Sequence, residues 1–115
     1  MLHTARNELP AKRGLRAQVF AALGDPTRLT LVTKLCGGPP CSISQLTQDT
    51  KLTRQAVTKH LQVLAQAHIV SSTRAGRETR FAFNPAPIED IKKYLQIVSA
   101  QWDDALSRPR TFVER

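Results

Sequence analysis

The chain has 115 residues, of which 41% are apolar and 23% charged, the balance of one compact soluble domain. Because it holds no apolar stretch of about 20 residues and no apolar segment near its N-terminus, we expect a cytoplasmic protein without a membrane partner. Its 17 Lys and Arg against nine Asp and Glu give a formal net charge of +8, which favours a polyanionic partner.

The positive charge is concentrated in two segments. Residues 1–16 carry four basic and one acidic residue and residues 51–80 carry six and one, whereas the rest of the chain is balanced. We expect residues 1–13 to form a flexible basic arm, residues 14–107 to form the folded domain and residues 108–115 to be a tail. The alternative is a basic surface that serves solubility alone.

Two helices are predicted in the first third of the chain. Apolar residues at helical spacing predict a helix over residues 14–23, which ends before Asp25. Asp25 and Pro26 have the residue types of an N-cap and a first helical position, so a second helix should cover residues 26–36. The glycines and prolines of residues 37–40 end it. Its apolar stripe should comprise Leu29, Val32 and Cys36, with Leu31 and Leu35 beside it.

Two further helices are predicted in tandem. After a short extended piece over residues 41–43, Ser44 can cap a short helix that reaches about Thr50 and buries Leu46. Thr53 can then cap a fourth helix with an apolar face of Val57, Leu61 and Leu64. The opposite face of this helix is polar and basic: Arg54, Gln55, Thr58, Lys59 and Gln62.

A hairpin and a long helix complete the chain. The β-rich runs 69–74 and 79–83 flank a loop of four residues that contains Gly76. In the helix predicted over residues 87–107, apolar residues recur at spacings of 3, 4, 3, 4 and 3. This heptad-like pattern indicates pairing with another helix, although docking on the chain's own core explains a single stripe almost as well. The stripe comprises Ile88, Ile91, Leu95, Val98, Trp102 and Ala105.

The order of these elements predicts a winged helix-turn-helix, a mainly α fold of five helices with a two-stranded wing. The major groove of B-DNA admits one α-helix, where Arg pairs with guanine and Gln with adenine. We therefore expect double-stranded DNA to be contacted by the polar face of the fourth helix, its cap and the arginines of the hairpin. These residues are Thr53, Arg54, Gln55, Thr58, Lys59, His60, Gln62, Arg74, Arg77 and Arg80.

The run TRQAVTKHLQVL over residues 53–64, followed by AHIV at 67–70 and RAGRE at 74–78, resembles the recognition helix and wing of the ArsR/SmtB family of bacterial transcriptional repressors. The run FAALGDPTRL at 20–29 resembles that family's opening signature. The resemblance implies a homodimer built from the first and last helices, which binds a pseudo-palindromic operator and releases it when an inducer binds. The interface residues would be Leu15, Val19, Ile91, Leu95, Val98 and Trp102.

The metal-ligand motifs of the family are absent. Where many members carry Cys-x-Cys, this chain has Ser42 and Ser44, and hydroxyls are poor ligands for soft metals. The last helix, which supplies His ligands for zinc in other members, has no His. We therefore expect no metal and no cofactor, and the absence of a nucleophile motif or a Gly-rich phosphate loop argues against an enzyme.

The signal that releases DNA is left open by the sequence. Cys36 and Cys41 flank a Gly-Gly-Pro-Pro loop and could form a redox switch; the alternative is a buried Cys36 and a small Cys41 with packing roles only. Relatives that sense oxidants pair a cysteine in this region with one in the last helix, and this last helix has none. A different alternative is a winged-helix module that contacts protein or RNA. His68 occupies a position where the family usually has Gly, which predicts a positive φ there.

Overall fold

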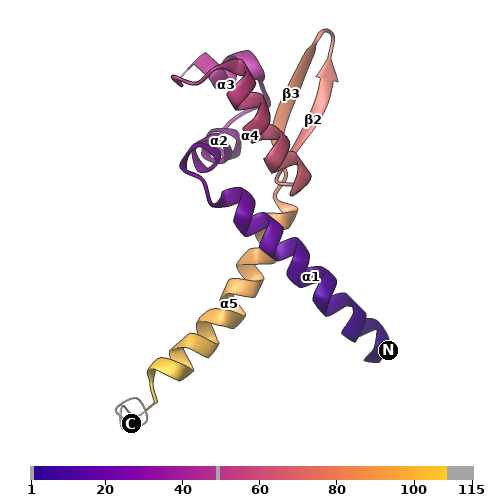
Figure 1. The fold of residues 1–115 in the computed structure, drawn as a ribbon, viewed down its shortest axis with the longest axis vertical. Helices are drawn as coiled ribbons and strands as arrows, with labels where there is room; N and C mark the ends of the chain where they lie inside the picture. Colours follow the sequence, from indigo (N-terminus) through magenta and orange to yellow (C-terminus); the bar gives the residue numbers. More distant parts are fainter. Residues whose placement is uncertain (1, 49, 109–115) are drawn as a thin grey trace.

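The computed structural model describes residues 2–48 and 50–108, which form five helices and a small antiparallel sheet (Figure 1). The two long helices cross below the remaining elements and diverge toward the two ends of the chain. We call residues 26–83 the head and the two long helices the stalk. In chain order the elements are α1 (Leu2–Leu23), α2 (Pro26–Cys36), β1 (Cys41–Ser42), α3 (Ile43–Gln48), α4 (Arg54–Gln66), β2 (Val70–Ala75), β3 (Glu78–Phe83) and α5 (Ala86–Leu106).

The first helix is longer than predicted. We expected it to begin at residue 14, but α1 begins at Leu2 and passes through Gly14, so that residues 2–13 of the expected arm are helical. A glycine inside a helix costs about 1 kcal/mol relative to alanine, which weakens the helix without ending it. Of the expected tail, residues 109–115 lie outside the described residues.

Side-chain caps fix where the head helices begin. Asp25 accepts a hydrogen bond from the backbone N–H of Arg28 at 3.0 Å, and Thr53 accepts one from Ala56 at 3.1 Å; both caps were predicted. The predicted cap at Ser44 is wrong. Ser42 Oγ accepts from the N–H of Gln45 at 3.2 Å while Gln45 Oε1 accepts from the N–H of Ser42 at 2.8 Å. This reciprocal capping box satisfies two donors at once, so α3 begins at Ile43.

The buried face of α2 also differs from the prediction. Leu31, Val32 and Leu35 are buried, whereas Leu29 is 49% exposed and Cys36 is exposed. At 100° per residue, Leu29 and Cys36 lie about 120° and 100° around the helix from Leu35, outside the arc that faces the core. The expectation of a buried Cys36 is therefore wrong.

The sheet has three strands in the order β1-β3-β2, all antiparallel. The hairpin pairs Val70 with Phe83 at one end and Ala75 with Glu78 at the other, so its turn has two residues instead of the predicted four. Gly76 has φ +65°, which suits glycine at the first central position of such a turn. The third strand, β1, was not predicted as part of the wing because two residues carry no alternation pattern.

The core lies almost entirely in the head. Its fully buried side chains are Leu31, Leu46, Val57, Leu61, Leu64 and Ile69. From the stalk, α1 adds Val19 and Ala22, and Ile91 is the buried residue of α5. The chain turns from α4 into the sheet at His68, whose φ of 60° confirms the predicted positive value. Within the described residues, no helix is both long and apolar enough to span a membrane.

Candidate nucleic-acid interface

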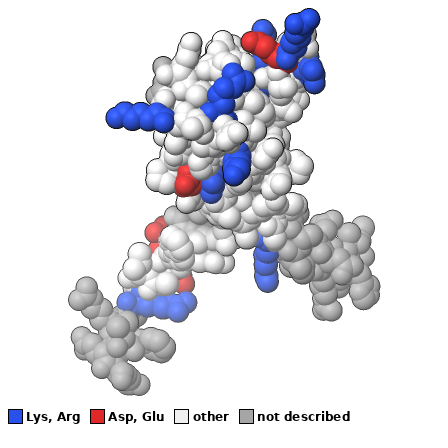
Figure 2. Space-filling model, turned by 45° about the horizontal axis from the view of Figure 1, so that its top comes forward, with Lys and Arg blue, Asp and Glu red and all other residues white. Residues whose placement is uncertain are grey.

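Helix α4 is anchored along one face and open along the other. Val57, Leu61 and Leu64 are completely buried, which fixes the orientation of the helix on the core. The opposite face borders a shallow surface hollow lined only by predicted contact residues: Arg54, Gln55, Thr58, Lys59 and Gln62. Figure 2 shows Lys and Arg side chains projecting from the head, with few carboxylates among them. The arrangement presents cations and amides on a rigid cylinder that fits a major groove.

Hydrogen bonds orient the leading end of this face. Arg54 Nη1 donates to Ser44 Oγ of α3 at 2.7 Å, and Thr58 Oγ1 donates to the carbonyl of Arg54 at 2.7 Å. Thr53 Oγ1 already accepts from Ala56, so only its hydroxyl proton is available to a phosphate. Ser44 is a member of this surface that sequence reasoning missed, because residues 44 and 54 belong to different helices and no periodicity links them.

The predicted hairpin cations do not lie on one face. Arg74 pairs with Thr79 across the hairpin, and the neighbouring residue Thr73 pairs with Arg80. Because successive side chains of a strand point to opposite faces, Arg74 and Arg80 lie on opposite faces of the hairpin. Arg80 Nε also lies 3.4 Å from Glu78 Oε2 in an exposed ion pair. Arg77 and Arg54 line a common hollow together with Ser44 and Thr79, so the turn of the wing and the start of α4 form one surface.

His60 is separate from this surface. Its ring is half-buried and turned toward the start of α2, where Nδ1 lies 3.2 Å from Arg28 Nη1 and 3.9 Å from Asp25 Oδ2. His60 is consequently a contact within the head, unlike its neighbours Lys59 and Gln62. The pKa of Asp25 is lowered, first by the hydrogen bond from the Arg28 N–H and further by the charge of the Arg28 guanidinium.

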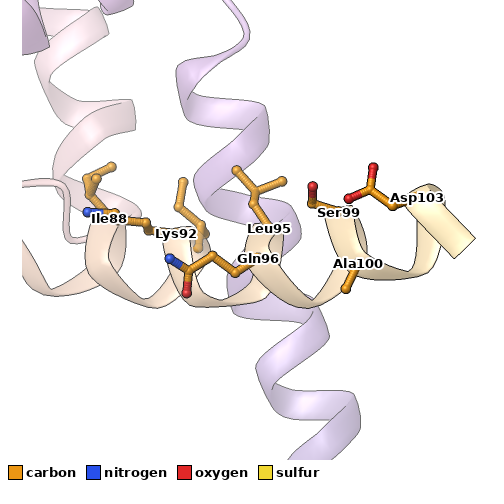
Figure 3. Close-up of a pocket in the computed structure, with 8 residues that line it drawn as sticks. Ile88, Lys92, Leu95, Gln96, Ser99, Ala100 and Asp103 are labelled. Atoms are coloured by element: carbon orange, nitrogen blue, oxygen red, sulfur yellow. The ribbon is translucent and has the colours of Figure 1, made fainter.

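The residues predicted for dimerisation fall into two groups. Val19 and Ile91 are buried in the core of the single chain, so neither is available at its surface. By contrast, Leu15, Leu95 and Trp102 are 55%, 45% and 64% exposed, and Val98 is half-buried. Figure 3 shows an apolar hollow along α5 whose labelled side chains come from that one helix, with α1 passing behind it.

A polar and aromatic contact joins the two helices of the stalk, α1 and α5. Arg16 of α1 donates to both carboxylate oxygens of Asp90 of α5, at 3.0 and 3.3 Å, and its guanidinium lies 4.9 Å from the centre of the Tyr94 ring. The hydrogen bond to Asp90 raises the pKa of Arg16. Phe20 packs against Tyr94 with ring centres 6.3 Å apart, so Tyr94 joins the two helices of one chain.

The predicted cysteine pair consists of two free thiols. Cys36 is exposed at the end of α2, and Cys41 is half-buried in β1, where its thiol donates to the carbonyl of Pro39 at 3.3 Å. Among the residues that the structure describes, no group of three or more His, Cys, Asp or Glu side chains could hold a metal ion.

Comparison with known proteins places this geometry in a regulatory family. Residues 25–72 match the family described as bacterial regulatory protein, arsR family. The uncharacterized HTH-type transcriptional regulator YuzN of Bacillus subtilis is 35% identical over 86 residues, covering 70% of this chain and 94% of that protein. An ArsR-like transcriptional regulator from Rhodococcus superposes with a TM-score of 0.74 at 33% identity, covering 89% of this chain and 95% of its own.

A more distant structure, at 20% identity and a TM-score of 0.65, shares the fold. It is the homodimeric winged helix-turn-helix domain of Mb0332 from Mycobacterium bovis, with 80% of this chain and 84% of that one covered. The fold predicted from the sequence is thereby confirmed.

Proposed function

Because this chain belongs to the arsR family of bacterial regulatory proteins and is a DNA-binding transcriptional regulator, we propose that it is a repressor that binds a pseudo-palindromic operator as a homodimer. The observation that carries the proposal is the exposed polar face of α4, which is continuous with the turn of the wing. Its buried apolar face holds that surface rigidly, as insertion into a groove requires.

Each contact residue has a proposed role. Arg54 and Gln55, at the leading end of α4, read base edges, where a bidentate pair is worth about 1 to 3 kcal/mol of discrimination. Thr53, Lys59 and Arg77 bind phosphates and fix the register without reading sequence. Thr58 and Gln62 line the hollow on the outer face of α4 and extend the contact along the groove. Arg74 pairs with Thr79 and lies on the same face of the hairpin. Arg80, paired with Glu78, contributes least.

The homodimer is proposed from the exposed apolar stripe of the stalk. Helix α5 has 21 residues, of which Ile91 is the buried one, so most of its apolar surface has no cover within the described chain. The protein titled homodimeric among the structural neighbours shares this fold. We assign the interface to Leu15, Leu95, Val98 and Trp102. For two α4 helices to enter successive turns of the major groove, the dimer must set them about 34 Å apart.

The releasing signal is proposed to be other than a metal. Both hydroxyls that replace the family's cysteine ligands are already used, since Ser42 caps α3 and Ser44 accepts from Arg54. The thiols of Cys36 and Cys41 remain the alternative signal, as redox-active groups.

The test is a fluorescence-anisotropy titration. An operator is selected from random duplexes and from the fragment upstream of the protein's own gene, and its binding is compared with that of a scrambled duplex. We expect selective binding whose log K falls with log salt at a slope of about −7 if the dimer neutralises about eight phosphates. Equal affinity for both duplexes, or a slope near zero, contradicts the proposal.

Further arms of the same titration separate the alternatives. Addition of a thiol oxidant tests the role of Cys36 and Cys41, and addition of zinc tests metal release; we expect zinc to leave operator affinity unchanged. Reversal of charge at Arg54 and Lys59 should abolish DNA binding. If a protein or RNA ligand stayed bound to that variant, the module would serve an interaction other than operator recognition.

A further inference from the structure

A single arginine joins three helices at the base of the head. Arg28, in the first turn of α2, donates from Nε to the carbonyl of Ala22 at 2.6 Å and from Nη2 to that of Ala21 at 3.4 Å. Both carbonyls lie at the carboxyl end of α1, where the last carbonyls of a helix lack intrahelical partners. The carbonyl of Ala21 also accepts from the N–H of Gly24 at 3.2 Å. The third nitrogen, Nη1, lies 3.2 Å from His60 Nδ1 on the recognition helix.

The chemistry of this junction determines which atom donates. Arginine stays protonated and has no acceptor, so the short contact requires His60 Nδ1 to accept and the ring proton to sit on Nε2. Asp25 does not replace Arg28 as the hydrogen-bond partner of the imidazole. Its Oδ2 accepts from the backbone N–H of Arg28 at 3.0 Å and lies 3.9 Å from His60 Nδ1. Asp25 thus stabilises the first turn of α2, which orients the guanidinium of Arg28, and the guanidinium in turn orients the His60 ring.

The junction connects the two parts of the molecule on which operator recognition depends. A planar guanidinium fixes the relative directions of its three donors, so the end of α1 and the side of α4 cannot shift independently while all three bonds persist. Gln18 Nε2 of α1 donates to the carbonyl of Gln66 at 3.2 Å and so holds the carboxyl end of α4. Arg28 instead contacts the middle of α4, because His60 lies between the DNA-contacting residues Lys59 and Gln62.

We propose that Arg28 is a positioning residue for sequence recognition, which transmits the position of the stalk to the recognition helix through His60. The inference rests on the proposed function as a dimeric operator-binding protein. In such a dimer the separation of two α4 helices must match one turn of DNA, about 34 Å. A loosened junction spoils this register for base contacts while leaving flexible phosphate contacts, which tolerate displacement, in place.

Four variants test this role. Arg28→Lys keeps the charge but cannot span three acceptors, and Arg28→Gln removes the charge. His60→Leu removes the acceptor, whereas His60→Asn keeps an oxygen acceptor near the position of Nδ1. Lys93→Gln, on the exposed surface of α5, is the control for loss of one cation. For each variant the affinities for the selected operator and for a scrambled duplex are measured, together with sedimentation and urea unfolding.

We expect Arg28→Lys, Arg28→Gln and His60→Leu to lower the ratio of operator to scrambled affinity about tenfold, the size of one lost charge-assisted hydrogen bond. The affinity of Arg28→Lys and His60→Leu for the scrambled duplex should stay within about threefold, and the dimer should persist. His60→Asn should restore the ratio to within about threefold of the unmodified protein, and Lys93→Gln should not alter it.

Two results would overturn the inference. One is an unchanged affinity ratio in Arg28→Lys and His60→Leu, and the other is a loss of both affinities in proportion to the fraction unfolded, which indicates a structural role alone. Should Arg28→Lys fail to fold, His60→Leu decides, because it leaves both bonds to α1 in place. If the unmodified protein itself shows no preference, the proposed function fails and the inference falls with it; a preference lost only in the variants supports the inference.

Discussion

The head and the stalk differ in how far each satisfies its own apolar surface. In the head, the apolar sides of α2, α3 and α4 meet over completely buried leucines such as Leu31, Leu46 and Leu61. In the stalk, α5 buries Ile91 while Trp102 and Leu106 remain 64% and 83% exposed. A large apolar area left in water costs about 25 cal/mol per Å². One chain therefore completes the core of the head, whereas the exposed apolar stripe of the stalk would be covered only in the proposed dimer.

The largest effect is expected when a side chain in the core of the head is shortened. Leu61→Ala should lower the free energy of unfolding by about 2 to 5 kcal/mol, because a completely buried leucine leaves a cavity. Urea unfolding followed by circular dichroism measures this loss. Val63→Ala, on the same helix but 37% exposed, is the control and should cost less than about 1 kcal/mol. Equal losses in both variants would mean that the head has no core of its own.

The stalk is tested by placing a charge on its exposed stripe. Trp102→Asp should weaken dimerisation by at least about tenfold, because a carboxylate would be buried without a partner. Sedimentation velocity measures the association, and circular dichroism should show an unchanged head. Ile97→Asp is the matched control: Ile97 is 59% exposed, but it lies about 160° around the helix from Leu95. A dimer that survives Trp102→Asp would remove this end of α5 from the interface.

Within the head, base contacts and phosphate contacts should be separable by mutation. Arg54→Ala and Gln55→Ala should each reduce discrimination between operator and scrambled duplex by about 1 to 3 kcal/mol, since they remove base contacts. Arg77→Ala should weaken both duplexes nearly equally and make the salt slope shallower by about 1, since it removes a phosphate contact. Anisotropy titrations at three salt concentrations measure both quantities. A uniform loss in Arg54→Ala would reassign that residue to the backbone.

The smallest expected effect lies where head and stalk meet. The folded pKa of Asp25 is lowered by the hydrogen bond from Arg28, so its contribution to stability is complete above the unfolded pKa, about 3.9, and is lost as pH falls through the folded value. Unfolding between pH 5 and pH 2 should show this loss. Asp25→Asn keeps a capping oxygen but does not titrate. Its stability should therefore vary less with acid; equal acid sensitivity would show that other carboxylates dominate.

Much of the architecture was predictable because its signals are local. Asp25 with Pro26 predicts the start of α2, Thr53 predicts that of α4, and the i, i+4, i+7 spacing of Val57, Leu61 and Leu64 predicts the buried face. Errors arose where two local signals compete. Ser42 and Ser44 both have a residue type that favours an N-cap. Ser42 is the one used because the Gln45 side chain accepts a second hydrogen bond from the Ser42 backbone N–H.

The candidate site shows the same division. The residues on the outer face of α4 follow from helical periodicity, which depends on the sequence alone. The inward turn of His60, the contact of Arg54 with Ser44 and the opposite faces of Arg74 and Arg80 do not. Each of these depends on which partner another element brings within hydrogen-bonding distance, or on strand register.

Helix caps, periodicity and charge are properties of neighbouring residues, and they were enough to predict five helices, a hairpin and a basic face on α4. The resemblance of the runs at residues 20–29 and 53–64 to known repressors indicated the family. The folded chain was needed to show that Val19 and Ile91 belong to the core while Leu95 and Trp102 stay outside. It was also needed to show that Arg28 bridges α1 and His60. Burial and hydrogen bonding are satisfied between segments far apart in the chain, and residue spacing carries no information about such contacts.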